Sequence, residues 1–79
     1  MADYNGTFSI GFEYITDTSA HTGRFWKLYA LADAVINTAT VQNASGNTFS
    51  SVPLNAGDCI EGVFTSVTLT SGKIVAYKI

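Results

Sequence analysis

The residue types that support catalysis are few in this chain. Its 79 residues include one histidine, His21, and one cysteine, Cys59. A catalytic nucleophile needs a base beside it and a group that orients this base, and no serine stands in a Gly-x-Ser-x-Gly elbow. His21 lies in the polar stretch 17–23, which is typical of a surface loop. The sequence therefore predicts a solvated loop histidine and a protein that is not an enzyme.

Metal and cofactor chemistry also lacks its usual residues. One cysteine and one histidine cannot form a zinc cluster, so Cys59 is expected to be a small buried apolar side chain. The nominal carboxylate pairs, Asp58 with Glu61 and Asp17 with Asp33, are interpreted as surface charges at strand ends. No glycine-rich phosphate motif is present in the sequence. We predict no catalytic residue, no metal and no cofactor.

Charge and hydropathy patterning exclude two classes of partner. The net charge is −2 with four Lys and Arg residues, which gives no basic surface for a nucleic-acid backbone. The first residues lack the basic and apolar regions of a signal peptide, and no apolar run approaches the roughly 20 residues that span a bilayer. We expect synthesis in the cytoplasm and no binding to nucleic acid or membrane.

The size of the chain predicts one domain, residues 1–79, that has partners. A chain of 8.4 kDa buries only roughly 60% of the surface that its unfolded form exposes, so it is marginally stable alone. One cysteine cannot form an internal disulfide. The composition is 47% hydrophobic and 13% charged, against a usual charged fraction of about 25%. These values favour a homo-oligomer, with a trimer among the candidate states.

Apolar and polar residues alternate with the period of a β-strand. In residues 6–15, Phe8, Ile10, Phe12 and Tyr14 alternate with small or polar residues. Residues 24–31 are apolar on both faces if they are extended. A helix over residues 27–36 is the alternative, but it is short and lacks a capping residue, so a strand is preferred.

Four further strands are predicted, at residues 34–41, 48–52, 59–69 and 73–79. Pro53 is expected to end its strand or to place it at a sheet edge. The Ser71-Gly72 turn predicts a hairpin in which Leu69 lies opposite Ile74. About six to seven antiparallel strands with short turns indicate an all-β fold, a small single-domain β-sandwich or barrel.

Several of these strands are apolar on both faces, so one face of each needs a cover. For the intrachain core we predict Phe8, Ile10, Phe12, Trp26, Leu28, Val67, Leu69 and Ile74. The candidate subunit contacts are then Phe25, Tyr29, Phe64 and Tyr77, because aromatic side chains are enriched at contact cores. Alternatively, exposed aromatic rings stack on sugars, and the chain is a carbohydrate- or receptor-binding module.

Residues 54–78 read L-x-A-G-D-x-I-x-G-x-F-T-S-V-T-L-T-S-G-K-I-V-A-Y-K, about a third of the chain. This segment resembles the C-terminal part of short virion proteins of tailed bacteriophages, chiefly from marine and cyanobacterial hosts. The resemblance implies a structural protein of the virion, most specifically a capsid decoration or cement protein. Such a protein binds the head lattice as a small oligomer, with the major capsid protein or another virion protein as its partner. A head–tail or tail component is the alternative, and the resemblance supplies no catalytic residue.

Overall fold

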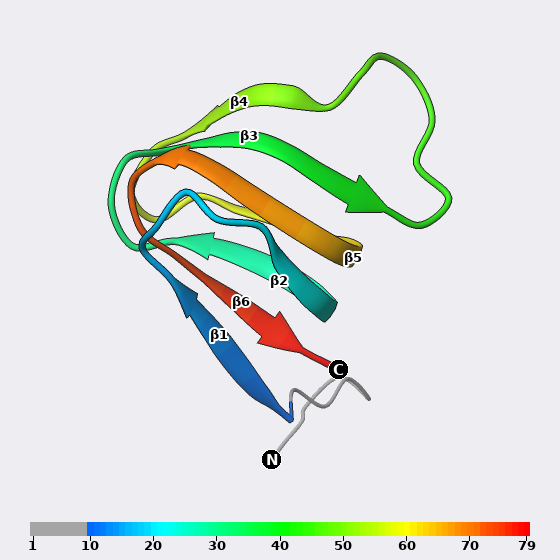
Figure 1. Ribbon diagram of the computed structural model, residues 1–79, viewed down its shortest axis with the longest axis horizontal. Coiled ribbons are helices and arrows are strands. Elements are labelled where there is room, and N and C mark those ends of the chain that lie inside the picture. The colour runs from blue at the N-terminus through cyan, green and yellow to red at the C-terminus, as the bar shows by residue number, and fades with distance from the viewer. Residues whose placement is uncertain (1–9) are drawn as a thin grey trace.

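The computed structural model describes residues 10–79 and arranges them in one antiparallel sheet of six strands (Figure 1). The strands are β1 (Gly11–Ile15), β2 (His21–Ala30), β3 (Ala34–Val41), β4 (Ser50–Leu54), β5 (Cys59–Ser71) and β6 (Ile74–Lys78). The predicted all-β class and number of strands are confirmed, and residues 24–30 of the predicted strand 24–31 lie in a strand and not in a helix. Within residues 10–79, no helix is long and apolar enough to cross a membrane.

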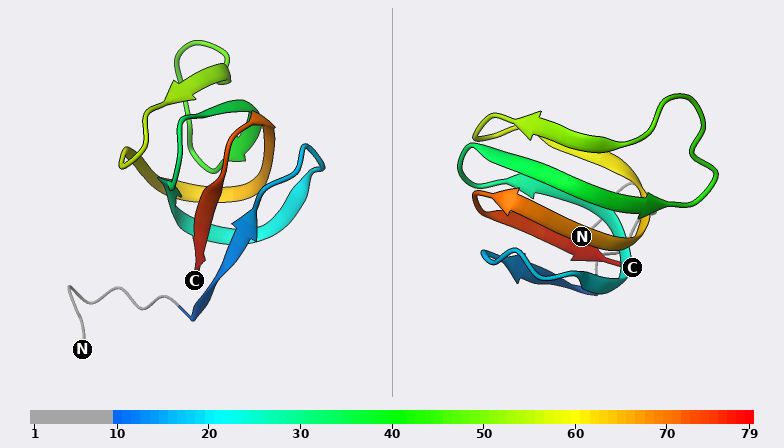
Figure 2. Two further views of the ribbon diagram at one scale, coloured as in Figure 1. Left: turned by 90° about the vertical axis from the view of Figure 1, so that its left-hand side faces the viewer. Right: turned by 45° about the horizontal axis from the view of Figure 1, so that its top comes forward.

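The strand order in the sheet is β1-β6-β2-β5-β3-β4, and every pair is antiparallel. The sheet is strongly curled, so its strands surround a single interior (Figure 2). β2 is central because it pairs with β5 on one side and with β6 on the other. A second sheet is therefore not needed to cover the core, and of the two predicted architectures the barrel-like one matches the curl of this sheet.

Register shifts explain how so short a sheet curls. The pairing of β2 with β5 is irregular between Thr22 and Lys27, and the pairing of β2 with β6 shifts between Phe25 and Lys27. The pairing of β3 with β5 shifts at further positions. An extra residue in one strand of an antiparallel pair bends that strand and increases its twist. The irregular pairing of β2 therefore bends the sheet at its centre.

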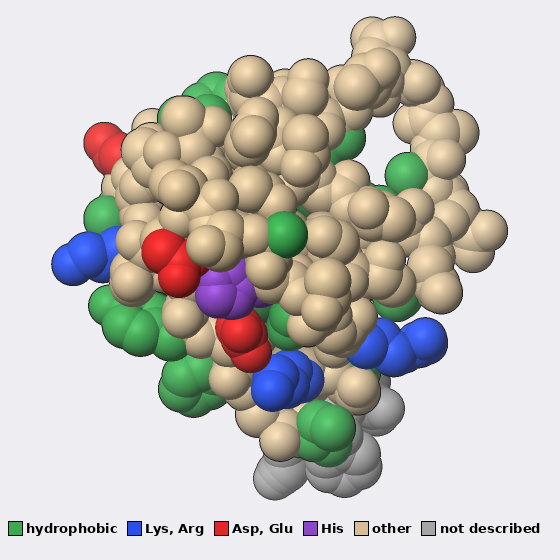
Figure 3. Space-filling model, in the orientation of Figure 1, with side chains coloured by type: hydrophobic (Ala, Val, Ile, Leu, Met, Phe, Trp, Pro, Cys, Tyr) green, Lys and Arg blue, Asp and Glu red, His purple; other side chains and the backbone are tan. Residues whose placement is uncertain are grey.

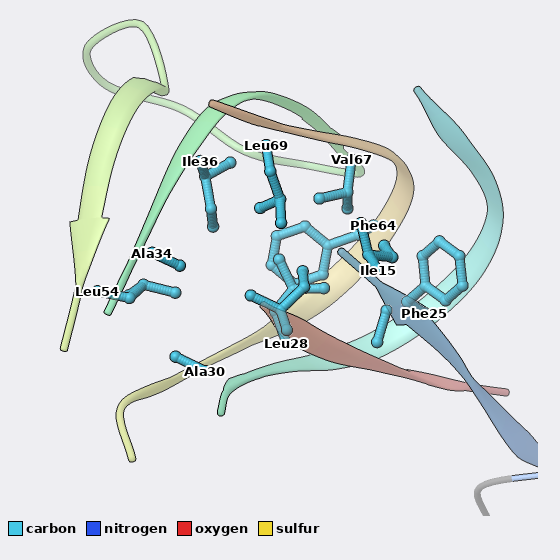
Figure 4. Packing of buried hydrophobic residues seen from close by; sticks show 12 residues of the cluster. Ile15, Phe25, Leu28, Ala30, Ala34, Ile36, Leu54, Phe64, Val67 and Leu69 are labelled. Atoms are coloured by element: carbon cyan, nitrogen blue, oxygen red, sulfur yellow. The ribbon is translucent and has the colours of Figure 1, made fainter. Parts of the chain in front are cut away.

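The concave face of the sheet forms the hydrophobic core (Figure 4). Phe25 of β2 and Phe64 of β5 lie opposite each other in the strand register, and both are buried. No polar or charged residue among residues 10–79 is fully buried. The other core residues are Ile15, Leu28, Ala30, Ala34, Ile36, Leu54, Val67, Leu69, Ile74 and Ala76.

The predicted assignment of faces is wrong for β2. Phe25 and Phe64, expected as subunit contacts, are 0% and 1% exposed in the core. For Phe64 the cause is an irregularity in β5, since the successive residues Thr40 and Val41 of β3 lie opposite Ser66 and Phe64 and leave Thr65 as an extra residue. For Phe25 the cause is a bulge in β2, since Phe25 and Lys27 lie opposite the successive residues Lys78 and Tyr77 of β6 and leave Trp26 as the extra residue. This extra residue reverses the alternation, so Phe25 and Leu28 share the inner face. Leu28 is buried as predicted, and so are Val67, Leu69 and Ile74.

The assignment is also wrong for β1. Ile10 and Phe12, both predicted core residues, are 76% and 59% exposed. The predicted alternation does occur in β1, but Glu13 and the buried Ile15 occupy its inner face. Phe8, another predicted core residue, lies outside the described residues.

The predicted hairpin of β5 with β6 does not form, because β2 lies between these strands in the sheet. Ser71 pairs with Val35 of β3, whereas Ile74 pairs with Ala30 of β2. The intervening Gly72 is the corner of this crossing. Its φ is +91°, and a Cβ atom there would lie 2.5 Å from the Cα of Ala34. The Ser71-Gly72 turn has the sequence of a hairpin turn, but it connects two strands that are not neighbours and packs closely against Ala34.

Replacing Gly72 with alanine is expected to destabilise the fold strongly. The positive φ costs roughly 1–3 kcal/mol for a residue with a Cβ, and the contact with the Ala34 backbone adds about 1–3 kcal/mol of overpacking. Gly46→Ala is the matched control, because Gly46 has a φ of +99° and a Cβ there would meet no atom within 4 Å. Urea unfolding of both variants measures the difference, and equal losses of stability would contradict a tight corner at Gly72.

Candidate functional site

Aromatic side chains gather on the convex face of the sheet, over β1, β6 and β2. The register places Tyr14, Val75 and Tyr29 in one row across these strands. The next row contains Phe12, Tyr77 and Lys27. Trp26 stands beside Tyr77. We call the aromatic residues of these rows the convex patch, and they are Phe12, Tyr14, Trp26, Tyr29 and Tyr77.

The convex patch is exposed at its outer end and ordered at its centre. Phe12 and Tyr14, on the strand at one end of the sheet, are 59% and 55% exposed. The ring of Phe12 meets that of Tyr77 edge-on, with centroids 6.2 Å apart, and Tyr77 in turn lies 6.4 Å from Trp26. These contacts hold the rings in a fixed arrangement. The patch therefore presents apolar surface without large reorganisation.

Charge lies at the border of the convex patch. The Lys27 ammonium is 5.5 Å from the centroid of the Trp26 ring, within the range of a cation–π contact. Lys27 is also the cross-strand partner of Glu61 on β5. The indole Nε1 of Trp26 is buried and has no hydrogen-bond partner among the residues described. Trp26 is thus held by its ring contacts and not by a hydrogen bond.

Two of the predicted contact residues, Tyr29 and Tyr77, lie on the convex patch, and Phe25 and Phe64 do not. Phe12 and Tyr14 belong to the patch but were not among the predicted contacts. The sequence did contain a signal for them. Ile15 lies on the same face of the strand as Glu13, and its burial makes that face the inner one, so Phe12 and Tyr14 lie on the outer face.

His21 is not the solvated loop residue that the sequence predicted. It is the first residue of β2, and its side chain is 18% exposed. Its ring nitrogens contact two carboxylates: Nδ1 is 2.9 Å from Oε2 of Glu13, and Nε2 is 2.7 Å from Oδ1 of Asp17. The Lys78 ammonium lies 3.7 Å from Oε1 of Glu13. Figure 3 shows the histidine flanked by acidic side chains.

These contacts favour the charged forms of His21, Glu13 and Asp17. Hydrogen bonds to Asp17 and then to Glu13 raise the pKa of His21. The contact with His21 lowers the pKa of Glu13, and His21 together with the Ser19 amide lowers that of Asp17. When protonated, the imidazole donates through both nitrogens and keeps no lone pair for a substrate. The arrangement is an ionic link between β1 and the start of β2.

The ionic link predicts a stability optimum in weak acid. The raised pKa of His21 adds stability below its ordinary value of 6.5, and this is lost as the pH rises through the folded-state value. The lowered pKa values of Glu13 and Asp17 add stability above 4.5 and 3.8, which is lost on acidification. Both contributions are complete between pH 4.5 and 6.5.

Thermal unfolding of the wild type and of His21→Gln across this range measures the effect. The difference in Tm is expected to be greatest inside the window and to shrink on both sides. Thr22→Gln, at an exposed neighbouring position, serves as the control. A Tm difference that does not change with pH would contradict the ionic link.

The remaining reactive residues lie apart. Cys59 is exposed, contrary to expectation, because its register opposite Tyr29 places it on the convex side. Asp58 and Asp33 belong to different pairs of those named from the sequence. The Asp58 carboxylate accepts a hydrogen bond from the Asn55 amide and that of Asp33 from the Ala56 amide, so both stabilise the turn that follows β4. Among residues 10–79, no group of three or more His, Cys, Asp or Glu is placed to hold a metal ion.

A hollow of about 330 Å³ lies under the connection between β3 and β4. Its lining residues are uncharged and include Thr40, Asn47 and Phe49. Figure 1 shows this connection extending away from the sheet, and Figure 3 shows the gap beneath it.

Comparison of the chain with protein-family models, with curated proteins and with solved structures finds no match. The features from which a function can be inferred are therefore those of the molecule itself. They are the convex patch, the ionic link around His21 and the hollow under the β3–β4 connection.

Proposed function

We propose that this chain is a non-enzymatic structural protein that works by assembling, through the convex patch, with copies of itself and with a larger partner. The observation that carries the proposal is the exposure of Phe12 and Tyr14 side by side with the ordered ring of Tyr77. Grouped exposed aromatic residues mark contact surfaces, whereas isolated exposed apolar residues are ordinary.

The energy available at this surface suits an association. Full burial of a large apolar side chain contributes about 1.5–3 kcal/mol. Phe12 and Tyr14 are each more than half exposed, so covering both contributes about 2–3 kcal/mol for each copy. The Lys27 ammonium lies over the Trp26 ring, 5.5 Å from its centroid, so the one cation in these rows already has a contact within the chain.

The more specific proposal is a capsid decoration protein of a tailed bacteriophage, bound to the major capsid protein in the virion. It is supported by the resemblance of residues 54–78 to short virion proteins, by the low charged fraction of 13%, and by the small β-domain. A head–tail or tail position in the virion is the alternative within the same class.

Light scattering across a dilution series tests the assembly proposal. The wild type is expected to have a molar mass above that of one chain, decreasing on dilution, and Phe12→Ser is expected to shift the equilibrium towards the monomer by about tenfold or more. Because Phe12 is exposed, this variant should keep the Tm of the wild type. Asn37→Ser, at an exposed position on β3, is the control.

Co-sedimentation with empty heads, assembled from the major capsid protein of a tailed bacteriophage, tests the partner. Saturable binding that Phe12→Ser weakens and Asn37→Ser does not would support the decoration role. A wild type that is monomeric at every concentration and does not bind the heads would contradict the proposed function.

Carbohydrate binding is a second candidate, favoured by the hollow under the β3–β4 connection. Lining residues that carry a ring, an amide and a hydroxyl and no charge match the apolar face and hydroxyl groups of a neutral sugar. A glycan array should then show selective binding that Phe49→Ala removes, and no signal on the array would end this candidate.

A further inference from the structure

The histidine of the ionic link needs a proton on each ring nitrogen to keep both carboxylates. Nδ1 of His21 is 2.9 Å from Oε2 of Glu13, and Nε2 is 2.7 Å from Oδ1 of Asp17. A neutral imidazole donates through one nitrogen and carries a lone pair on the other. After losing a proton, His21 would therefore hold this lone pair against a carboxylate oxygen, and one of the two contacts must open.

The contact that opens is the one with Glu13. Asp17 lies in the connection from β1 to β2, and its Oδ1 also accepts a hydrogen bond from the Ser19 amide at 3.1 Å. This carboxylate is thus held in place by its own turn. The Glu13 side chain is 33% exposed, and the Lys78 ammonium lies 3.7 Å from its other oxygen. Glu13 can accordingly turn to Lys78 and to water, whereas Asp17 stays with the ring.

Release of Glu13 loosens the strand that carries the exposed end of the convex patch. Glu13 stands between Phe12 and Tyr14 in β1, at one end of the strand order. Its contact with His21 links β1 to β2 past the intervening β6. Without this contact, β1 is held by its pairing with β6 and by the burial of Ile15. An element with fewer contacts opens locally more often.

We infer that the proton on His21 controls assembly through the convex patch, because the charged imidazole fixes β1 in the arrangement that associates and the neutral imidazole releases it. This inference rests on the proposed assembly function and adds its regulation. The apparent affinity of a surface that is correctly arranged for part of the time falls with that fraction. Association should therefore weaken as the pH rises through the titration of His21. Since such coupling is reciprocal, assembly in turn favours the protonated ring.

The charged groups of the ionic link come from three parts of the fold. Glu13 is on β1, Asp17 is in the connection that follows it, and Lys78 is on β6 beside Glu13. The residue of β5 opposite His21 is Val67, which carries no charge. The sequence contains one histidine, and histidine is the side chain that ordinarily titrates between about pH 5 and 8. A transition in this range that a change in the link removes is therefore assigned to this ring.

Light scattering of a dilution series at several pH values between about 5 and 9 tests the switch. The dissociation constant of the wild type is expected to rise about tenfold or more across this range. Glu13→Gln should keep its affinity at the alkaline end, because a glutamine amide donates to Nδ1 of the neutral ring while Nε2–H donates to Asp17.

Asn37→Lys is the matched control for Glu13→Gln. It lies at an exposed position on β3, changes the net charge by the same amount and leaves the ionic link intact. This variant should keep the pH dependence of the wild type. Loss of the pH dependence in both variants would assign the effect to net charge and overturn the switch.

Titration of the His21 ring protons by NMR gives an independent measurement on the unmodified protein. The midpoint should lie at higher pH in concentrated, assembled protein than in dilute protein. Equal midpoints, together with a dissociation constant that does not change with pH, would overturn the switch and leave the proposed assembly standing. A wild type that is monomeric at every pH would instead contradict the self-assembly on which the inference rests.

Discussion

The burial of Phe25 and Phe64 inside a single sheet is the constraint on which the rest of this structure depends. Both rings lie on the concave face, opposite each other in the strand register and fully buried. A chain of this length has a single sheet with which to enclose them, so the sheet must curl around the pair. The curl leaves the opposite face of β1, β6 and β2 without a covering layer, and the convex patch lies on that face. The core and the proposed contact surface are thus two results of one constraint.

Local patterns in the sequence were sufficient for the strands and insufficient for their faces. Alternation and β-branched residues indicate all six strands, and Pro53 does lie in an edge strand. The bulge at Trp26 is invisible to a period-two analysis, because one inserted residue exchanges inside for outside along the strand. The Ser71-Gly72 turn satisfies the local rule for a hairpin, but the position of β2 between β5 and β6 is decided by long-range packing.

Only part of the candidate site could be predicted from the sequence. Tyr29 and Tyr77 were identified as contact candidates and lie on the convex patch, whereas Phe12 was assigned to the core. For His21 the surrounding sequence is polar and resembles a loop. Its contact with Glu13 depends on the curl of the sheet, since β6 separates β1 from β2 in the strand order. No local pattern reports a contact of that kind.

The position of β6 in the sheet also bears on how the protein is made. β6 pairs with both β1 and β2, so two strands that are synthesised early share a neighbour that is synthesised late. Until residues 74–78 have left the ribosome, β1 has no strand beside it among the described residues, and the rows of the convex patch are incomplete. The surface that we propose for assembly therefore comes into existence only when the fold is finished. A chain still in synthesis therefore lacks the ordered rows through which the finished protein is proposed to assemble.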